Sequence, residues 1–275
     1  MTDWPAIIEA DFAVPADAEL TDLVDELTDA LRSPDPVRRD DQAYPVLATW
    51  ILAGHLDGQL AALGERITGL FDHPAIQART FAALILASLV RRDAKAEVLD
   101  APTVLRWSDR FARWWLAETD LRGFDERLGW LHAIAHGADV VGELGQSTRL
   151  GRDDLIGLLD LACSRLIADT AYVFAHQEDD RVALAVATVL TRPELSAEAA
   201  TGWLGPVRRY FEAGQPGPVP APAANTMRTL RSLYLMADRG FRPDPGSPGP
   251  VRPPHRAEIM AAVGEVLHLA FPPQT

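Results

Sequence analysis

The stretch Gly129 to Glu143 reads Gly-Trp-Leu-His-Ala-Ile-Ala-His-Gly-Ala-Asp-Val-Val-Gly-Glu, and reactive side chains recur in it at helical spacing. With about 100° of rotation per residue, His136, Asp139 and Glu143 fall at about 40°, −20° and 20° from His132. We therefore predict that these four polar side chains share one narrow face of a helix. The opposite, buried face is predicted to carry Trp130, Ile134, Val141 and Leu144.

The same 3.6-residue period of apolar side chains recurs from one end of the chain to the other. It predicts helices over residues 20–31, 36–51, 60–71, 75–90, 102–115, 127–144, 155–166, 178–190, 196–211, 223–237 and 256–269. Pro45 is expected to kink the second of these helices. We find no convincing strand, because no segment alternates Val, Ile and Thr with polar residues.

Short breaks between successive helices indicate that neighbouring helices pack antiparallel. The sequence therefore predicts an all-α protein with about ten helices in stacked antiparallel pairs, an α-α superhelix of HEAT-like type. We expect residues 1–275 to form a single helical-repeat domain. Proline and glycine cluster in 214–222 and 243–254, which predicts two mobile loops.

The overall charge argues against broad nucleic-acid binding. The chain has 26 Lys and Arg against 39 Asp and Glu, a net charge of −13, which repels phosphate backbones.

Cys163 is the single cysteine, so no disulfide forms within the chain and a reduced cytoplasmic location is expected. The longest apolar stretch, Phe81 to Val90, is far shorter than the ~18 residues that span a bilayer, so we expect no membrane segment.

Several short segments resemble a known family. They are Ser33-Pro34-Asp35-Pro36, Arg39-Asp40, Trp50-Ile51, Arg79-Thr80-Phe81, Gly129-Trp130 with His132, His136-Gly137-Ala138-Asp139 and Glu178-Asp179-Asp180-Arg181. Together they resemble the bacterial family called domain of unknown function 2785. The resemblance implies an all-helical fold and supplies no activity.

Two histidines four residues apart on a helix can bind one metal ion, and Asp139 could add an oxygen ligand. No glutamate lies between His132 and His136, so the zinc-protease pattern is absent and a structural polar network is the plainer interpretation. The cofactor is unknown from sequence, and a divalent metal is the possibility we consider at His132, His136 and Asp139.

Glu178 and Arg181 form the other dense polar group between positions 120 and 190, at the predicted start of a helix. Capping explains the carboxylates there, whereas Arg181 could pair with Asp139 or with a ligand. We predict that this group acts together with the histidines. The candidate ligand-binding residues are His132, His136, Asp139, Glu178, Arg181 and Trp130.

Three classes of function follow. A scaffold that binds a protein or a small molecule comes first, because no complete catalytic constellation is present. A metal-dependent or small-molecule enzyme that uses His132, His136 and Asp139 comes second. A helical-repeat protein that acts on nucleic acid comes third and is disfavoured by the net charge.

Overall fold

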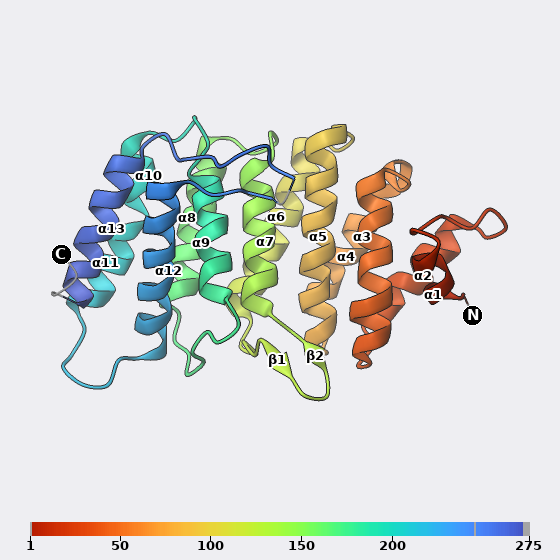
Figure 1. Ribbon diagram of the computed structural model, residues 1–275, viewed down its shortest axis with the longest axis horizontal. Coiled ribbons are helices and arrows are strands. Elements are labelled where there is room, and N and C mark those ends of the chain that lie inside the picture. Colours follow the sequence, from red (N-terminus) through yellow and green to blue (C-terminus); the bar gives the residue numbers. More distant parts are fainter. Residues whose placement is uncertain (1, 245, 272–275) are drawn as a thin grey trace. The chain divides into compact units, whose positions relative to one another are not determined.

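A computed structural model describes residues 2–244 and 246–271, and helices dominate it (Figure 1). The elements are α1 (Trp4–Glu9), α2 (Leu20–Ala30), η1 (Val37–Ala43), α3 (Tyr44–Ala53), η2 (Asp57–Gln59), α4 (Leu60–Gly69), η3 (Leu70–Asp72), α5 (Ile76–Ala96), α6 (Ala101–Ala117), β1 (Phe124–Asp125), β2 (Gly129–Trp130), α7 (Ala133–Gln146), α8 (Arg152–Ile167), α9 (Glu178–Val189), α10 (Ala197–Gly202), α11 (Leu204–Glu212), α12 (Ala221–Arg239) and α13 (Arg256–Ala270). The predicted all-α class is confirmed.

The chain divides into two compact units. The first contains the residues up to Trp114 together with Asp120–Val140, and the second contains Trp115–Thr119 and the chain from Val141 onward. Each unit has its own buried apolar core. The HEAT-like pairing and the single domain over residues 1–275 stay predictions.

The 21-residue helix α5 is the centre of the first unit, and α3 and α4 both pack against it (Figure 1). Its buried side chains point in all directions around the axis, because neighbouring elements cover it on several sides. Aromatic side chains of α6 complete the core. The Phe71 ring stacks on Trp114, with 4.8 Å between ring centroids.

The helix expected over residues 36–51 is replaced by two segments. Residues 37–43 form a π-helix, η1, and α3 follows it directly. Pro45 cannot donate a hydrogen bond to the carbonyl of Asp41, and its ring crowds that carbonyl, so a wider turn before it relieves both problems. This turn carries Arg39, which is buried, and Asp40, which is half-buried.

A small hairpin replaces the first two turns of the helix predicted from residue 127. Strands β1 and β2 pair antiparallel, with Phe124 opposite Trp130. The Asp125 carboxylate accepts hydrogen bonds from the backbone N–H groups of Arg127 and Leu128 at 3.0 and 2.9 Å, which fixes the turn. The prediction that no strand forms is therefore wrong here, and Trp130 is 43% exposed rather than buried.

In the second unit, α12 packs against both α9 and α13, and α8 contacts α9, α11 and α12. The helix expected over residues 196–211 is divided into α10 and α11 at Trp203. Pro206 explains the division, because it lacks the N–H that would bond to the carbonyl of Gly202. Arg165 is buried and donates to the carbonyl of Trp115, in the last turn of α6, at 2.9 Å and to the carbonyl of Glu118, just beyond it, at 3.1 Å.

The two proline- and glycine-rich segments differ in structure. Residues 214–220 contain no helix, and α12 begins at Ala221, inside the predicted 214–222 loop. In the 243–254 segment, of which residue 245 is not described, Val251 pairs with Phe241 as an isolated bridge. Their mobility stays a prediction.

Among the described residues, no single helix combines the length and apolarity needed to cross a bilayer. One pair of helices, residues 37–53 and 57–72, meets the length and composition criteria together but is bent by 102°.

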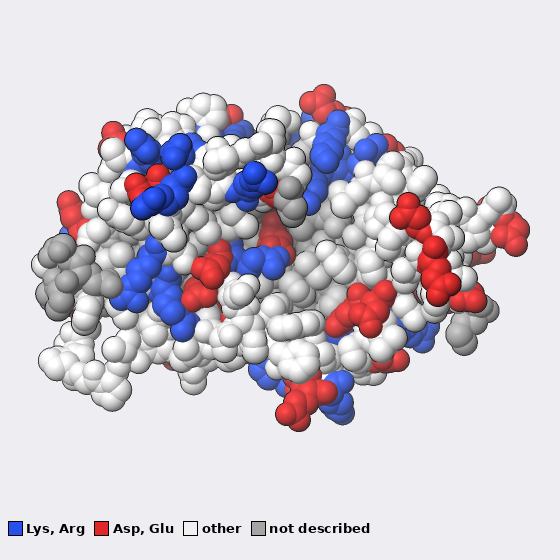
Figure 2. Space-filling model, viewed as in Figure 1, with Lys and Arg blue, Asp and Glu red and all other residues white. Residues whose placement is uncertain are grey.

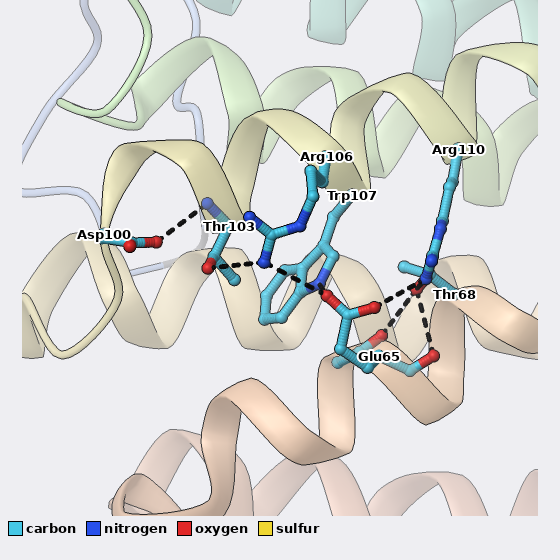
Figure 3. A network of polar contacts seen from close by, with 8 residues as sticks. Glu65, Thr68, Asp100, Thr103, Arg106, Trp107 and Arg110 are labelled. Carbon is cyan, nitrogen blue, oxygen red and sulfur yellow. Dashed lines mark hydrogen bonds and ion pairs between the residues drawn. The ribbon is translucent and has the colours of Figure 1, made fainter.

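A polar network joins α4 to α6 within the first unit (Figure 3). Glu65 accepts hydrogen bonds from the Trp107 indole at 3.1 Å and from Arg110 at 2.8 Å. Beside Glu65, a Cβ atom on Gly64 would lie 2.0 Å from the Trp107 ring, which is fully buried. The two helices therefore approach closely because residue 64 has no side chain.

We predict that Gly64→Ala lowers the free energy of unfolding by about 1–3 kcal/mol, because the added methyl group overpacks against a ring that cannot move away. Chemical denaturation of both proteins measures the difference. Gly69→Ala is the matched control, because a Cβ atom there meets nothing within 4 Å. Equal effects of the two substitutions would contradict the close-approach explanation.

Cys163 lies in α8 and is 1% exposed. Burial, with a smaller contribution from Asp160, raises the pKa of its thiol to about 11. At pH 8 roughly one thiol in a thousand is then the reactive thiolate.

We therefore predict that the folded protein reacts negligibly with a chromogenic disulfide reagent at pH 8. The same protein in denaturant should release one equivalent of chromophore per chain. Fast labelling without denaturant would show that Cys163 is accessible.

Candidate functional site

Arg39 on η1 is the central charged group of the first unit and is 0% exposed. Its Nη1 donates to the carbonyl of Ser33 at 2.9 Å, and its Nη2 donates to the carbonyls of Leu128, in a short contact, and Trp130, at 3.4 Å. The guanidinium carbon also lies 4.7 Å from the centroid of the Phe81 ring, a cation–π contact. One side chain thus holds η1, α5 and the hairpin together.

Asp40 pairs with Arg39, with 2.7 Å between its Oδ1 and the arginine Nε. Burial raises the pKa of the Asp40 carboxyl, while Arg39 and a hydrogen bond from the Trp130 backbone partly offset this effect. Gly129 permits this close arrangement. Its φ of 72° is left-handed, and a Cβ atom there would lie 2.8 Å from Pro36 and 3.1 Å from an Asp40 oxygen.

The two histidines lie next to this ion pair but on different elements. His132 precedes α7 and has a left-handed φ of 48°, whereas His136 lies in the first turn of α7. His136 Nδ1 is 3.2 Å from the carbonyl oxygen of Thr80. Because a carbonyl only accepts, Nδ1 carries the hydrogen, and in the neutral ring Nε2 is the nitrogen that can accept a hydrogen bond or a proton.

Aromatic rings connect these groups. His132 lies between Trp130 and His136, with centroid distances of 4.5 and 5.7 Å. Phe81 meets the edges of both His136, at 5.6 Å, and Tyr44, at 6.1 Å. The rings form a continuous wall from the hairpin to α3.

This wall lines an open pocket of about 360 Å³ that belongs entirely to the first unit. It is lined by Asp40, Asp41, Tyr44, Phe81, Leu84, Trp130, His132 and His136. Three separate parts of the chain supply these residues: the η1–α3 junction, α5, and the segment from β2 to α7. A pocket that combines apolar and aromatic walls with a few convergent polar groups is the usual form of a small-molecule site.

The structure brings Trp130, His132 and His136 together here, but the single helical face predicted for the histidines is wrong. His132 precedes the helix, so the 3.6-residue spacing does not govern its direction. Asp139 is on α7 but is not among the residues that line the pocket. Ile134, Val141 and Leu144 are buried as predicted.

Glu178 and Arg181 belong to the second unit. Glu178 is fully buried and accepts hydrogen bonds from the Tyr172 hydroxyl at 3.0 Å and the His176 backbone N–H at 2.7 Å. It therefore anchors the loop that leads into α9. Joint action of these residues with His132, His136 and Asp139 stays a prediction.

In the part of the chain that the structure describes, no three His, Cys, Asp or Glu side chains are arranged to hold a metal ion. The metal hypothesis for His132, His136 and Asp139 stays a prediction and gains no support from this geometry.

Sequence reasoning did not assign Asp40, Asp41, Tyr44, Phe81 and Leu84 to a site. A signal was present at Arg39, which continues the buried stripe of Ala43, Val46 and Trp50 at helical spacing. A charged residue on a core stripe requires buried partners. Those partners come from distant parts of the sequence, so the pattern could not name them.

The comparison with protein families identifies the family of this chain. The family model described as "Protein of unknown function (DUF2785)" matches residues 67–235. The chain belongs to the DUF2785 family. Segments that carried the sequence resemblance meet at this pocket: Arg39-Asp40, Phe81, Gly129-Trp130, His132 and His136. Of these, Arg39-Asp40 precedes the matched range of the DUF2785 model.

Among solved structures, the DUF2785 chain is similar to an engineered protein whose crystal structure was a target of the Northeast Structural Genomics Consortium. The identity is 13%, the match covers 90% of this chain and 96% of that chain, and the TM-score is 0.43. No curated protein matches the chain significantly.

We predict that Arg39→Met lowers the free energy of unfolding by about 3–5 kcal/mol, because it strands the Asp40 carboxyl and several backbone carbonyls without their donor. Thermal and chemical denaturation measure the loss. Arg38→Met is the matched control, since the neighbouring arginine is exposed. A small loss at position 39 would show that the buried guanidinium is not needed for stability.

Proposed function

We propose that this DUF2785 protein is a binding protein, a helical scaffold that holds a small molecule in the pocket between η1, α5 and the start of α7. The observation that carries the proposal is the buried Arg39, which fixes the pocket's walls from three segments. Walls fixed in this way reduce the entropy cost of ordering the site when a ligand binds.

The surface chemistry favours a small ligand over a nucleic acid. On the face drawn in Figure 2, the basic side chains of the described residues lie in small groups interspersed with acidic ones rather than in one continuous groove. The net charge of −13 adds to this effect. The pocket itself carries carboxylates, which also repel phosphate.

A second candidate is an enzyme that uses the same pocket. Burial raises the pKa of the Asp40 carboxyl, and the His136 imidazole lines the same pocket. A carboxylic acid and an imidazole that line one pocket are the side chains that general acid–base catalysis uses. Turnover of a compound that binds the pocket would favour this candidate over simple binding.

The proposal is tested with a substitution whose larger side chain fills the pocket. Leu84 lines it and is half-buried, so Leu84→Trp is expected to occupy its volume without entering the core. Leu235→Trp on α12 is the matched control, because Leu235 is 59% exposed and belongs to the second unit.

A fragment library of mixed charge is screened by saturation-transfer NMR against the parent protein and both variants. We expect fragments that bind the parent and Leu235→Trp but not Leu84→Trp. Identical binding to all three proteins would place the fragments elsewhere, and an absence of binding to the parent would remove the basis for a ligand pocket.

A further inference from the structure

The residues that line the pocket carry acidic charge and no basic side chain. Asp40 and Asp41 are both present, and neither Lys nor Arg is among the lining residues. Arg39 lies behind the wall and offsets the charge of Asp40 through their 2.7 Å ion pair. Asp41 is exposed and forms no ion pair with any described residue, so about one unit of negative charge is left at the pocket.

The guanidinium donors of Arg39 are already directed at protein groups. They point to the Asp40 carboxylate and to the backbone carbonyls of Ser33, Leu128 and Trp130. An anionic ligand would therefore meet carboxylates without a compensating cation, which is unfavourable in a partly buried site.

The aromatic side chains of the pocket also favour a positively charged ligand. The face of an aromatic ring attracts cations. One face of Phe81 is already covered by the Arg39 guanidinium, at 4.7 Å, so the other rings of the pocket must supply this attraction. Tyr44 and the half-exposed Trp130 also line the pocket. These rings can contact the apolar part of a ligand while the carboxylates face its charged end.

The polar groups of the pocket also favour a ligand that donates hydrogen bonds. An ionised carboxylate only accepts hydrogen bonds, and Asp40 and Asp41 both line the pocket. The volume of about 360 Å³ lies at the lower end of the ~300–1,000 Å³ range of small-molecule pockets. It thus suits a compact ligand.

We propose that the ligand is a small organic cation, an ammonium group on an apolar or aromatic carbon skeleton. The ammonium faces Asp41, and the skeleton lies against Tyr44, Phe81 and Trp130. This proposal rests on the proposed function, because it assigns a chemical class to the ligand of the same pocket.

Three probes that share a phenethyl skeleton and differ in charge test the proposal: phenethylammonium, phenethyl alcohol and phenylpropionate. Their dissociation constants are measured by saturation-transfer NMR titration at neutral pH and low salt. We expect phenethylammonium to bind at least tenfold more tightly than the alcohol, and phenylpropionate to bind most weakly.

Two variants show whether Asp41 causes the tighter binding of the ammonium probe. Asp41→Asn changes an exposed side chain, so the protein should fold, and it should weaken the ammonium probe about threefold or more while leaving the alcohol unchanged. Asp109→Asn is the matched control, because Asp109 is exposed on α6, is not among the pocket-lining residues and carries the same charge.

Equal binding of the ammonium and the alcohol would overturn the cation proposal and leave the ligand pocket standing. Equal weakening by Asp41→Asn and Asp109→Asn would also overturn it, because a general effect of net charge would then explain the preference. If no probe binds the parent protein, the cation proposal falls, and the mixed-charge fragment screen decides separately whether the proposed binding function falls with it.

Discussion

The removal of the Arg39 guanidinium from water is the constraint on which the first unit depends. A buried charge costs several kcal/mol unless its donors find partners and a counter-charge. The carbonyl of Ser33, the two hairpin carbonyls, the Asp40 carboxylate and the Phe81 ring supply these. The hairpin must therefore present its carbonyls to η1, and a side chain at Gly129 would prevent this approach.

The two members of the Arg39–Asp40 ion pair face in opposite directions, and this arrangement shapes the pocket. Arg39 faces the interior, where its Nη atoms donate to backbone carbonyls and its Nε pairs with Asp40, and Asp40 faces the cavity. The resulting site is acidic, although a buried arginine lies directly behind it. Arg39 offsets the charge of Asp40, so in our proposal the preference for cationic ligands comes from the neighbouring, exposed Asp41.

Local periodicity located most of the helices but not the site. The expected helices 20–31 and 178–190 end within one residue of α2 and α9, because apolar spacing is set by the helix period itself. The hairpin was missed because two-residue strands are too short to show alternation. The turn at Asp125 and Gly129 left only a faint signal in an otherwise helical pattern.

The same distinction applies within the motif. His136 was placed correctly on a helix, whereas His132 was not, because its left-handed backbone breaks the 3.6-residue count. Its position depends on the hairpin before it, and the hairpin depends on Arg39. No spacing rule within residues 129–143 contains that information.

The contact between Arg39 and Leu128 joins positions 89 residues apart. Closing a loop of that length costs several times the thermal energy before any contact compensates for it. We expect η1 and the hairpin to stay hydrated and apart until α5 has formed between them, so that the arginine is desolvated in the last step of assembly. A low φ-value for Arg39→Met in folding kinetics would be the signature of that order. The pocket would then form only after η1 and the hairpin have come together around Arg39. A partly folded chain would have no binding site.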